Sequence, residues 1–333
     1  MKHSFKNLFM VVMILVSLIG SSIQTTPVNA LGSLTKVPNL SSPGVAKLSG
    51  VWSADANNVF SVGYGSTSMG AAKLPIVYRG SGTNWTYTNF STSDLPATWG
   101  NGEFYAVWGA NTSNVFAVGT GGPGTNPTLP MAFRWNGTNW TSYYVPLPTT
   151  PVTFEVGFLY GVWGTSASNV YAVGSGNDAA GTNYPIVSHW NGSSWSSIGL
   201  ALPTNPDWHD AYLRAIWGSS ATDIWAAGNG ENSGGDIVPV LYHYNGTGWS
   251  PATRSLPPGW SNGYLYGIWG SSGNDIYAVG SGTNASDVTV PLGYRYNGST
   301  WTSYTPSLPS TSWESGELMS VWGVDANNIY AVG

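Results

Sequence analysis

Short apolar runs with a period of two follow the N-terminal segment, and polar turn residues separate them. This pattern lacks the spacing of an amphipathic helix, so it predicts β-strands. Residues 265–269 predict one strand, and residues 276–280 predict a second strand after a polar turn. A loop rich in Gly, Asn and Ser precedes a third strand, such as residues 185–190, and a fourth strand follows a tight turn. We name these strands a, b, c and d in chain order.

The tight turn between strands c and d is an Asn-Gly pair in four places. Asn-Gly between aromatic flanks favours a two-residue hairpin, because both turn residues adopt positive φ. The pairs are Asn136-Gly137, Asn191-Gly192, Asn245-Gly246 and Asn297-Gly298, and Gly80-Ser81-Gly82 takes their place in the first unit. Strands c and d are therefore expected to form a hairpin in every unit.

The four-strand unit recurs about every 54 residues. A tryptophan preceded by Val or Ile marks strand a at positions 52, 108, 163, 217, 269 and 322. A glycine follows eleven residues later, at positions 63, 119, 174, 228, 280 and 333. A second tryptophan marks strand d at positions 85, 140, 195, 249 and 301. Such fixed spacing indicates an internal repeat.

Four antiparallel strands at this period are typical of a β-propeller blade. We predict an all-β fold, a β-propeller of about six four-stranded antiparallel blades, with repeats starting near residues 48, 104, 159, 213, 265 and 318. Residues 33–40 resemble a strand d, and the sequence ends on strands a and b. We therefore expect the last blade to be composite or truncated. A solenoid of stacked hairpins is the alternative architecture.

Residues 1–30 have the pattern of a secretory signal peptide. Lys2 and Lys6 precede an apolar run over residues 8–19, and small residues at 28–30 offer a cleavage site. The apolar run is short for a spanning helix, which needs roughly 20 residues, although an uncleaved anchor is an alternative. We predict a secreted or cell-surface protein, with the propeller over residues 31–333 and no membrane insertion after signal cleavage.

The composition narrows the classes of partner and chemistry. The formal net charge is −5, and loss of Lys2 and Lys6 would make it more negative. Nucleic acids and anionic lipids bind basic surfaces, so this charge argues against both as partners. The absence of cysteine excludes disulfides, thiolate catalysis and cysteine-ligated metals. We expect no cofactor and no metal, and stability from packing alone.

The repeat resembles that of kelch-type propellers, in which a strand ending in glycine is followed by Tyr and Trp and a short proline-containing exit. Residues 170–174, 244–249 and 256–257 match these three elements. The chain departs from kelch units in having one glycine where they have two, and in a shorter hairpin turn. The Asn-Gly-Ser/Thr-x-Trp element also resembles the Asp-box of sialidase propellers without its aspartate. The resemblance implies a propeller, whereas kelch-like propellers include both binding proteins and oxidases.

Several other repeated positions are expected to be structural. Both tryptophan columns are expected to fill the space between neighbouring blades. Asn or Asp stands six residues after each first tryptophan and is expected to bond the backbone of a turn. A basic residue stands in strand c of five units, and a contact with an aromatic ring or loop carbonyl is favoured over a ring of anion sites. These basic residues are Arg79, Arg134, His189, His243 and Arg295.

The b–c and d–a loops are long and varied and emerge on the same face, which makes that face the expected binding surface. An aromatic residue stands nine positions before the first tryptophan of every unit except the first, which has Pro43 there, and polar residues follow it. An aromatic ring beside hydrogen-bonding groups suits a sugar or a protein partner, whereas packing between blades is the competing interpretation. The candidate ligand-binding residues are Trp99, Glu103, Phe154, Glu155, Trp208, His209, Asp210, Trp260, Asn262, Trp313 and Glu314.

The favoured function is non-catalytic recognition of a glycan or a surface protein. One alternative is a propeller enzyme of the glycoside hydrolase type, which would need two carboxylates about 5–9.5 Å apart. The main cluster that breaks the repeat is residues 207–210, with Arg214 nearby, and a histidine between carboxylates is suited to acid–base chemistry. A structural or adhesive surface module is the other alternative.

Overall fold

The computed structural model describes residues 45–333, except 69, 82–83, 125–127, 205–207, 253 and 308–313. The residues of the proposed signal peptide and of the extra strand over 33–40 lie outside this range. The described chain is built from antiparallel β-sheets, with one 3-10 turn at Thr92–Asp94 and no α-helix. No helix in it is long and apolar enough to cross a bilayer.

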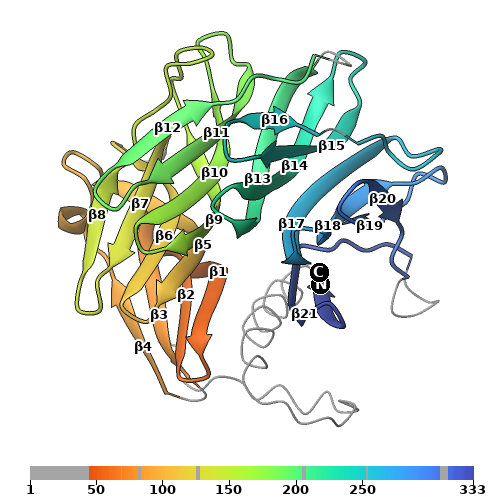
Figure 1. Ribbon diagram of the computed structural model, residues 1–333. Coiled ribbons are helices and arrows are strands. Elements are labelled where there is room, and N and C mark those ends of the chain that lie inside the picture. Colours follow the sequence, from red (N-terminus) through yellow and green to blue (C-terminus); the bar gives the residue numbers. More distant parts are fainter. Residues whose placement is uncertain are drawn as a thin grey trace. The chain divides into compact units, whose positions relative to one another are not determined.

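The described chain divides into two compact units, and the first covers residues 45–124 and 131–142. Its sheets have the orders β1-β2-β3-β4 and β5-β6-β7-β8, so each is a meander that follows the chain (Figure 1). The strands of the first sheet are β1 (Val45–Asp55), β2 (Asn58–Ser66), β3 (Leu74–Ser81) and β4 (Asn84–Asn89). Those of the second are β5 (Asn101–Asn111), β6 (Asn114–Gly122), β7 (Leu129–Trp135) and β8 (Trp140–Tyr144).

The second unit covers residues 128–130 and 143–333. Three four-stranded meanders and one two-stranded sheet follow one another in it (Figure 1). The first meander has β9 (Phe158–Ser166), β10 (Asn169–Asn177), β11 (Asn183–Trp190) and β12 (Trp195–Gly199). The next has β13 (Trp208–Ser220), β14 (Asp223–Asn232), β15 (Ile237–Tyr244) and β16 (Trp249–Pro251). The last strands are β17 (Asn262–Ser272), β18 (Asp275–Thr283), β19 (Thr289–Tyr296) and β20 (Trp301–Tyr304), then β21 (Ser320–Asp325) and β22 (Asn328–Val332).

The predicted all-β fold of four-stranded antiparallel propeller blades, about six in number, is confirmed. Strands a and b are longer than predicted. Their hydrogen-bonded pairing continues toward the loops, past the glycine that stands eleven residues after the first tryptophan. The b–c connection of the fourth blade is therefore only residues 233–236, whereas the sequence predicted a long loop there.

A β-bulge interrupts strand a at the same place in all five complete blades, and it explains the repeated glycine. In the fourth blade Leu213 pairs with Gly228 and Ala215 pairs with Ala227, so Arg214 is left outside the ladder. A Cβ on Gly228 would collide with the carbonyl oxygen of Tyr212. The bulged residues are Ser49, Tyr105, Tyr160, Arg214 and Tyr266. Only glycine permits this approach, and the bulge re-aims one side chain per blade.

The first tryptophan of a blade packs on a glycine of the next blade within each unit. A Cβ on Gly218 would meet the ring of Trp163, and a Cβ on Gly270 would meet the ring of Trp217. Trp52 with Gly109, and Trp269 with Gly323, repeat the contact. The small residues of strand a also pack closely, since a Cβ on Gly161 would lie 3.2 Å from the Cα of Ala215. The predicted role of the first tryptophan between blades is confirmed by these contacts.

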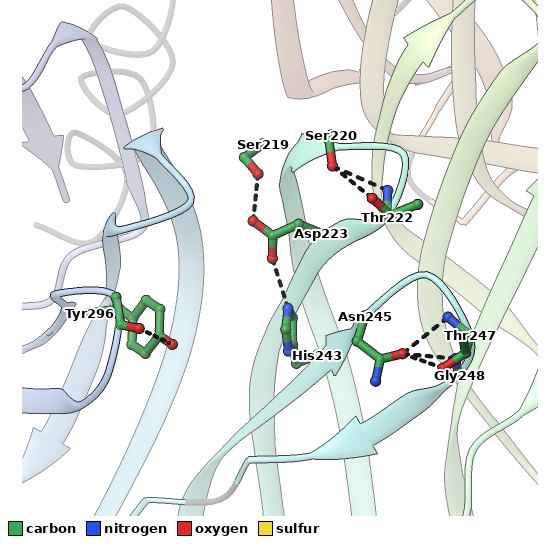
Figure 2. A network of polar contacts seen from close by, with 10 residues as sticks. Ser219, Ser220, Thr222, Asp223, His243, Asn245, Thr247, Gly248 and Tyr296 are labelled. Carbon is green, nitrogen blue, oxygen red and sulfur yellow. Dashed lines mark hydrogen bonds and ion pairs between the residues drawn. The ribbon is translucent and has the colours of Figure 1, made fainter.

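The basic residue of strand c has a structural role in every complete blade. In the fourth blade His243 stacks on Trp225 with ring centroids 4.1 Å apart, and its Nε2 lies 2.7 Å from Oδ1 of Asp223. Asp223 also accepts a hydrogen bond from Ser219 (Figure 2). The other four pairs of basic residue and Asn or Asp are Arg79–Asn58, Arg134–Asn114, His189–Asn169 and Arg295–Asp275. Each of the five basic residues also lies over an aromatic ring, so the stacking interpretation is confirmed. The Asn or Asp column, expected to bond the backbone of a turn, bonds these basic side chains instead.

Gly228→Ala is expected to destabilise the protein by about 3 kcal/mol, because the new methyl group overpacks against the backbone of strand a. Gly248→Ala is the matched control, since a Cβ there meets no atom within 4 Å, and a change within about 0.5 kcal/mol is expected. Urea unfolding of the two variants measures the difference. Equal stability of both variants would show that the bulge does not depend on glycine.

Stability is expected to depend on the protonation of His189. Burial lowers the pKa of this imidazole in the folded protein, so the unfolded chain binds the proton more readily. The contribution of the neutral, buried His189 to the free energy of unfolding is present above the unfolded pKa of about 6.5. It is lost as the pH falls through the folded pKa. Urea unfolding between about pH 7.5 and 5 should therefore show a steeper loss for the wild type than for His189→Gln. His209→Gln, which alters an exposed histidine, should leave the wild-type slope unchanged.

Candidate functional site

The aromatic residues of the predicted site anchor the d–a loops. Trp99, Phe154 and Trp208 are buried, with 7%, 4% and 6% of their surface exposed, and Trp260 is half-buried. Each ring packs on a glycine in strand b of its own blade, as Trp208 does on Gly230. The other glycines in these contacts are Gly121, Gly176 and Gly282. Trp313 lies outside the described residues.

Three polar residues of the predicted site fasten loops. Glu103 is buried and accepts from Lys73 Nζ at 3.0 Å and from the Tyr105 hydroxyl at 2.8 Å. Asp210 accepts from the backbone N and the Nδ2 of Asn183, at 2.6 and 3.1 Å. Oδ1 of Asn262 accepts from the backbone N of Thr283 at 3.0 Å. Their oxygens are therefore used as structural acceptors.

The remaining three predicted residues, Glu155, His209 and Glu314, are exposed. Each of them directly follows the aromatic residue of its own d–a loop. The described contacts do not join the three into one cluster. Asp207, from the cluster noted in the sequence, lies outside the described residues. Ligand binding by these eleven residues stays a prediction.

Trp208→Ala is expected to destabilise the protein by about 3–5 kcal/mol, because it removes a buried indole that packs on Gly230. His209→Ala is the neighbouring control, and its exposed side chain predicts a change within about 0.5 kcal/mol. Thermal and urea unfolding compare the two. Little change at Trp208 would favour a role in ligand binding for that ring.

Bulged residues of strand a and the residues two positions before them form a different candidate site in the second unit, which we call the strand-a surface. It comprises Tyr160, Tyr212, Arg214, Tyr264 and Tyr266, all half-buried. The neighbouring rings of Tyr264 and Tyr266 are almost parallel, with an angle of 12° and centroids 6.1 Å apart. Phe158 and Tyr160 form an equivalent pair, with an angle of 3°. The two rings of each pair stand two residues apart, so the period of the strand places them on the same side of strand a.

Arg214 stands where the other bulges of this unit have a tyrosine. Its guanidinium carbon lies 5.6 Å from the ring centroid of Tyr160 on the preceding blade. Its Nε donates to the buried Oδ1 of Asn229 at 3.3 Å. Within the described part of the chain no hydrogen bond occupies its two terminal nitrogens, so they are available to a ligand. Arginine presents these nitrogens as a rigid planar fork.

Burial and nearby carboxylates both raise the pKa of tyrosines in the strand-a surface. The pKa of Tyr212 is raised by burial and then by Asp210, while Arg214 opposes the shift and Glu231 adds to it. Burial likewise raises the pKa of Tyr266, a hydrogen bond with Ser281 lowers it, and Glu317 raises it. Both phenols are protonated at neutral pH, as an ordinary tyrosine is, and can donate as well as accept hydrogen bonds.

Sequence reasoning identified Arg214 only as a residue near the repeat-breaking cluster and did not identify the tyrosines. The available signal was a column three residues before each first tryptophan. Ser, Tyr, Arg and Met occur in that column, whereas the residue that follows in the chain is always Gly, Ala or Ser. No group of three or more His, Cys, Asp or Glu side chains at metal-binding spacing occurs among the described residues.

No protein-family model and no curated protein matches the chain. Among solved structures, a protein of unknown function from Dyadobacter fermentans has 9% sequence identity and a TM-score of 0.57, over 85% of this chain and 89% of that one. The Hadza microbial sialidase Hz136 has 12% identity and a TM-score of 0.50, over 84% of this chain and 61% of the sialidase. At these identities the likeness supports the propeller fold alone.

Proposed function

We propose that the chain is a secreted or cell-surface propeller of kelch-like repeats that recognises a neutral glycan without catalysis. Residues 1–30 would be the signal peptide and residues 31–333 the binding domain. The observation that carries the proposal is the strand-a surface, where bulges on consecutive blades present tyrosine rings around one arginine. The ligand would bind there, beside the exposed residues of the d–a loops.

The chemistry of the strand-a surface suits a sugar. Tyrosine rings offer flat apolar faces, and their neutral hydroxyls can exchange hydrogen bonds with sugar hydroxyls. The free nitrogens of Arg214 can donate to two neighbouring oxygens at once. The charged groups that act on Tyr212 and Tyr266 are one arginine, Arg214, and three carboxylates, Asp210, Glu231 and Glu317. This balance, together with the negative net charge of the chain, favours a neutral glycan over an acidic one.

The fixed roles of the carboxylates support recognition over hydrolysis. A hydrolase needs one carboxyl group as an acid and another as a base or nucleophile. Asp210 is bonded twice to Asn183, and Glu103 is bonded to Lys73 and Tyr105. These groups hold loops in place, so proton transfer by them would disturb the bonds that position the blades.

Binding of the mature protein to a broad glycan array, followed by calorimetry on the hits, tests this proposal. Arg214→Ala and Tyr160→Ala should each weaken binding by at least about tenfold. The first removes the central guanidinium group, and the second removes a ring on which the sugar stacks. Tyr144→Ala is the matched control, since this tyrosine is 64% exposed on β8.

Thermal unfolding of each variant verifies that the fold is intact. Unchanged affinity in Arg214→Ala and Tyr160→Ala would move the binding site away from the strand-a surface. Release of shorter sugars from a bound glycan would establish an enzyme instead of a recognition protein.

A further inference from the structure

A cavity of about 220 Å³ lies between the third and fourth blades, within the second unit. Tyr171, His189, Ser196, Tyr244, Thr247 and Trp249 are among the residues that line it. Ile198 also lines it and is 46% exposed, so the cavity opens toward solvent. The hairpin turn between β15 and β16 contributes Thr247 and Gly248. The cavity is therefore at the turn end of the blades, opposite the b–c and d–a loops.

Aromatic rings from both blades form the walls of the cavity. Tyr171 stacks on His189 with centroids 4.4 Å apart and an angle of 22°. The ring of Tyr171 lies 6.2 Å from that of Tyr244, which lies 5.5 Å from Trp249. His189 is held by its Nε2, which is 2.7 Å from Oδ1 of Asn169. The walls are thus fixed by contacts that do not involve a ligand.

The equivalent position between the fourth and fifth blades is filled by a larger ring. Trp225 replaces Tyr171 there, and Tyr296 and Trp301 replace Tyr244 and Trp249. The centroid of Trp225 lies 5.1 Å from that of Tyr296 and 5.3 Å from that of Trp301. Trp225 and Trp301 are only 4% and 9% exposed. In the third blade this position holds the smaller Tyr171, and the cavity therefore stays open.

The rim of the cavity carries hydroxyl and backbone groups at fixed positions. Oδ1 of Asn245 accepts from the backbone N of Thr247, from its Oγ1 and from the backbone N of Gly248 (Figure 2). The Thr247 hydroxyl can still accept a hydrogen bond, and Ser196 supplies a second hydroxyl on the opposite blade. The lining has no Asp, Glu, Lys or Arg, so it offers no charge to pair with an ionised ligand.

We propose that this cavity binds one neutral sugar residue. The cavity is smaller than sites for drug-sized ligands, which occupy about 300–1,000 Å³, and a single pyranose ring matches both its size and its lining. The apolar face of the sugar would pack on Tyr244 and Trp249, and its hydroxyls would bond Ser196 and Thr247. This site is separate from the strand-a surface and does not depend on a ligand there.

Titration with methyl glycosides of glucose, galactose, mannose and fucose, followed by tryptophan fluorescence and saturation-transfer NMR, tests the proposal. At least one glycoside should bind and perturb the emission, since Trp249 lines the cavity. Tyr171→Trp should weaken binding at least tenfold, because it fills the cavity as Trp225 does in the next blade. Tyr277→Trp is the matched control at the equivalent position of the fifth blade, and it should retain binding.

Thr247→Val is a second variant that removes a hydroxyl and adds little volume, and it should also weaken binding if Tyr171→Trp alters folding. Binding should persist in Arg214→Ala, which separates this cavity from the strand-a surface. Absence of binding by all four glycosides would overturn the proposal, as would wild-type affinity in both Tyr171→Trp and Thr247→Val. Loss in Arg214→Ala with retention in Tyr171→Trp would assign the sugar to the strand-a surface instead.

Discussion

The close approach of strand a to a glycine in strand b is the contact on which the blades depend. At Gly174 and Gly228 the Cα lies so near the carbonyl of the opposing strand that a methyl group would collide with it. Strand a gains one residue at this point and bends, and the following small residue meets the next strand a at close range. One backbone constraint thus sets both the curvature of a strand and the spacing of its neighbours.

Aromatic rings on glycines supply the stability that a disulfide-free chain needs from packing. Trp163 and Trp217 each rest on a glycine of the next blade, and Trp208 rests on a glycine of its own blade. A glycine lets a large flat ring approach the backbone, and such a ring buries a large apolar area. The repeated rings therefore serve the scaffold, and this use removes Trp99 and Trp208 from the surface.

The variable chemistry lies where the scaffold leaves positions unconstrained. The bulged residue of strand a is outside the ladder, so Tyr160, Arg214 and Tyr266 can replace one another without a change in pairing. The position of Tyr171 is similarly tolerant, since Trp225 fills the same place in the next blade with closer ring contacts. Both candidate sites arise from a substitution within a repeated column, not from an inserted loop.

The alternation of apolar and polar residues, the Asn-Gly turn pairs and the length of the repeat were sufficient to determine the all-β class and the order of four strands in a blade. The repeat also determined the structural role of the basic residue in strand c. These features depend on local pairing and on neighbours at a fixed distance in the chain. The role of Trp208 depended on tertiary structure. The same sequence pattern suits an exposed ring that stacks on a sugar and a buried ring that packs within the loop. The bulge at Arg214 and the cavity beside Tyr171 likewise depend on the distance between adjacent strands and blades. Residue type alone does not specify that distance.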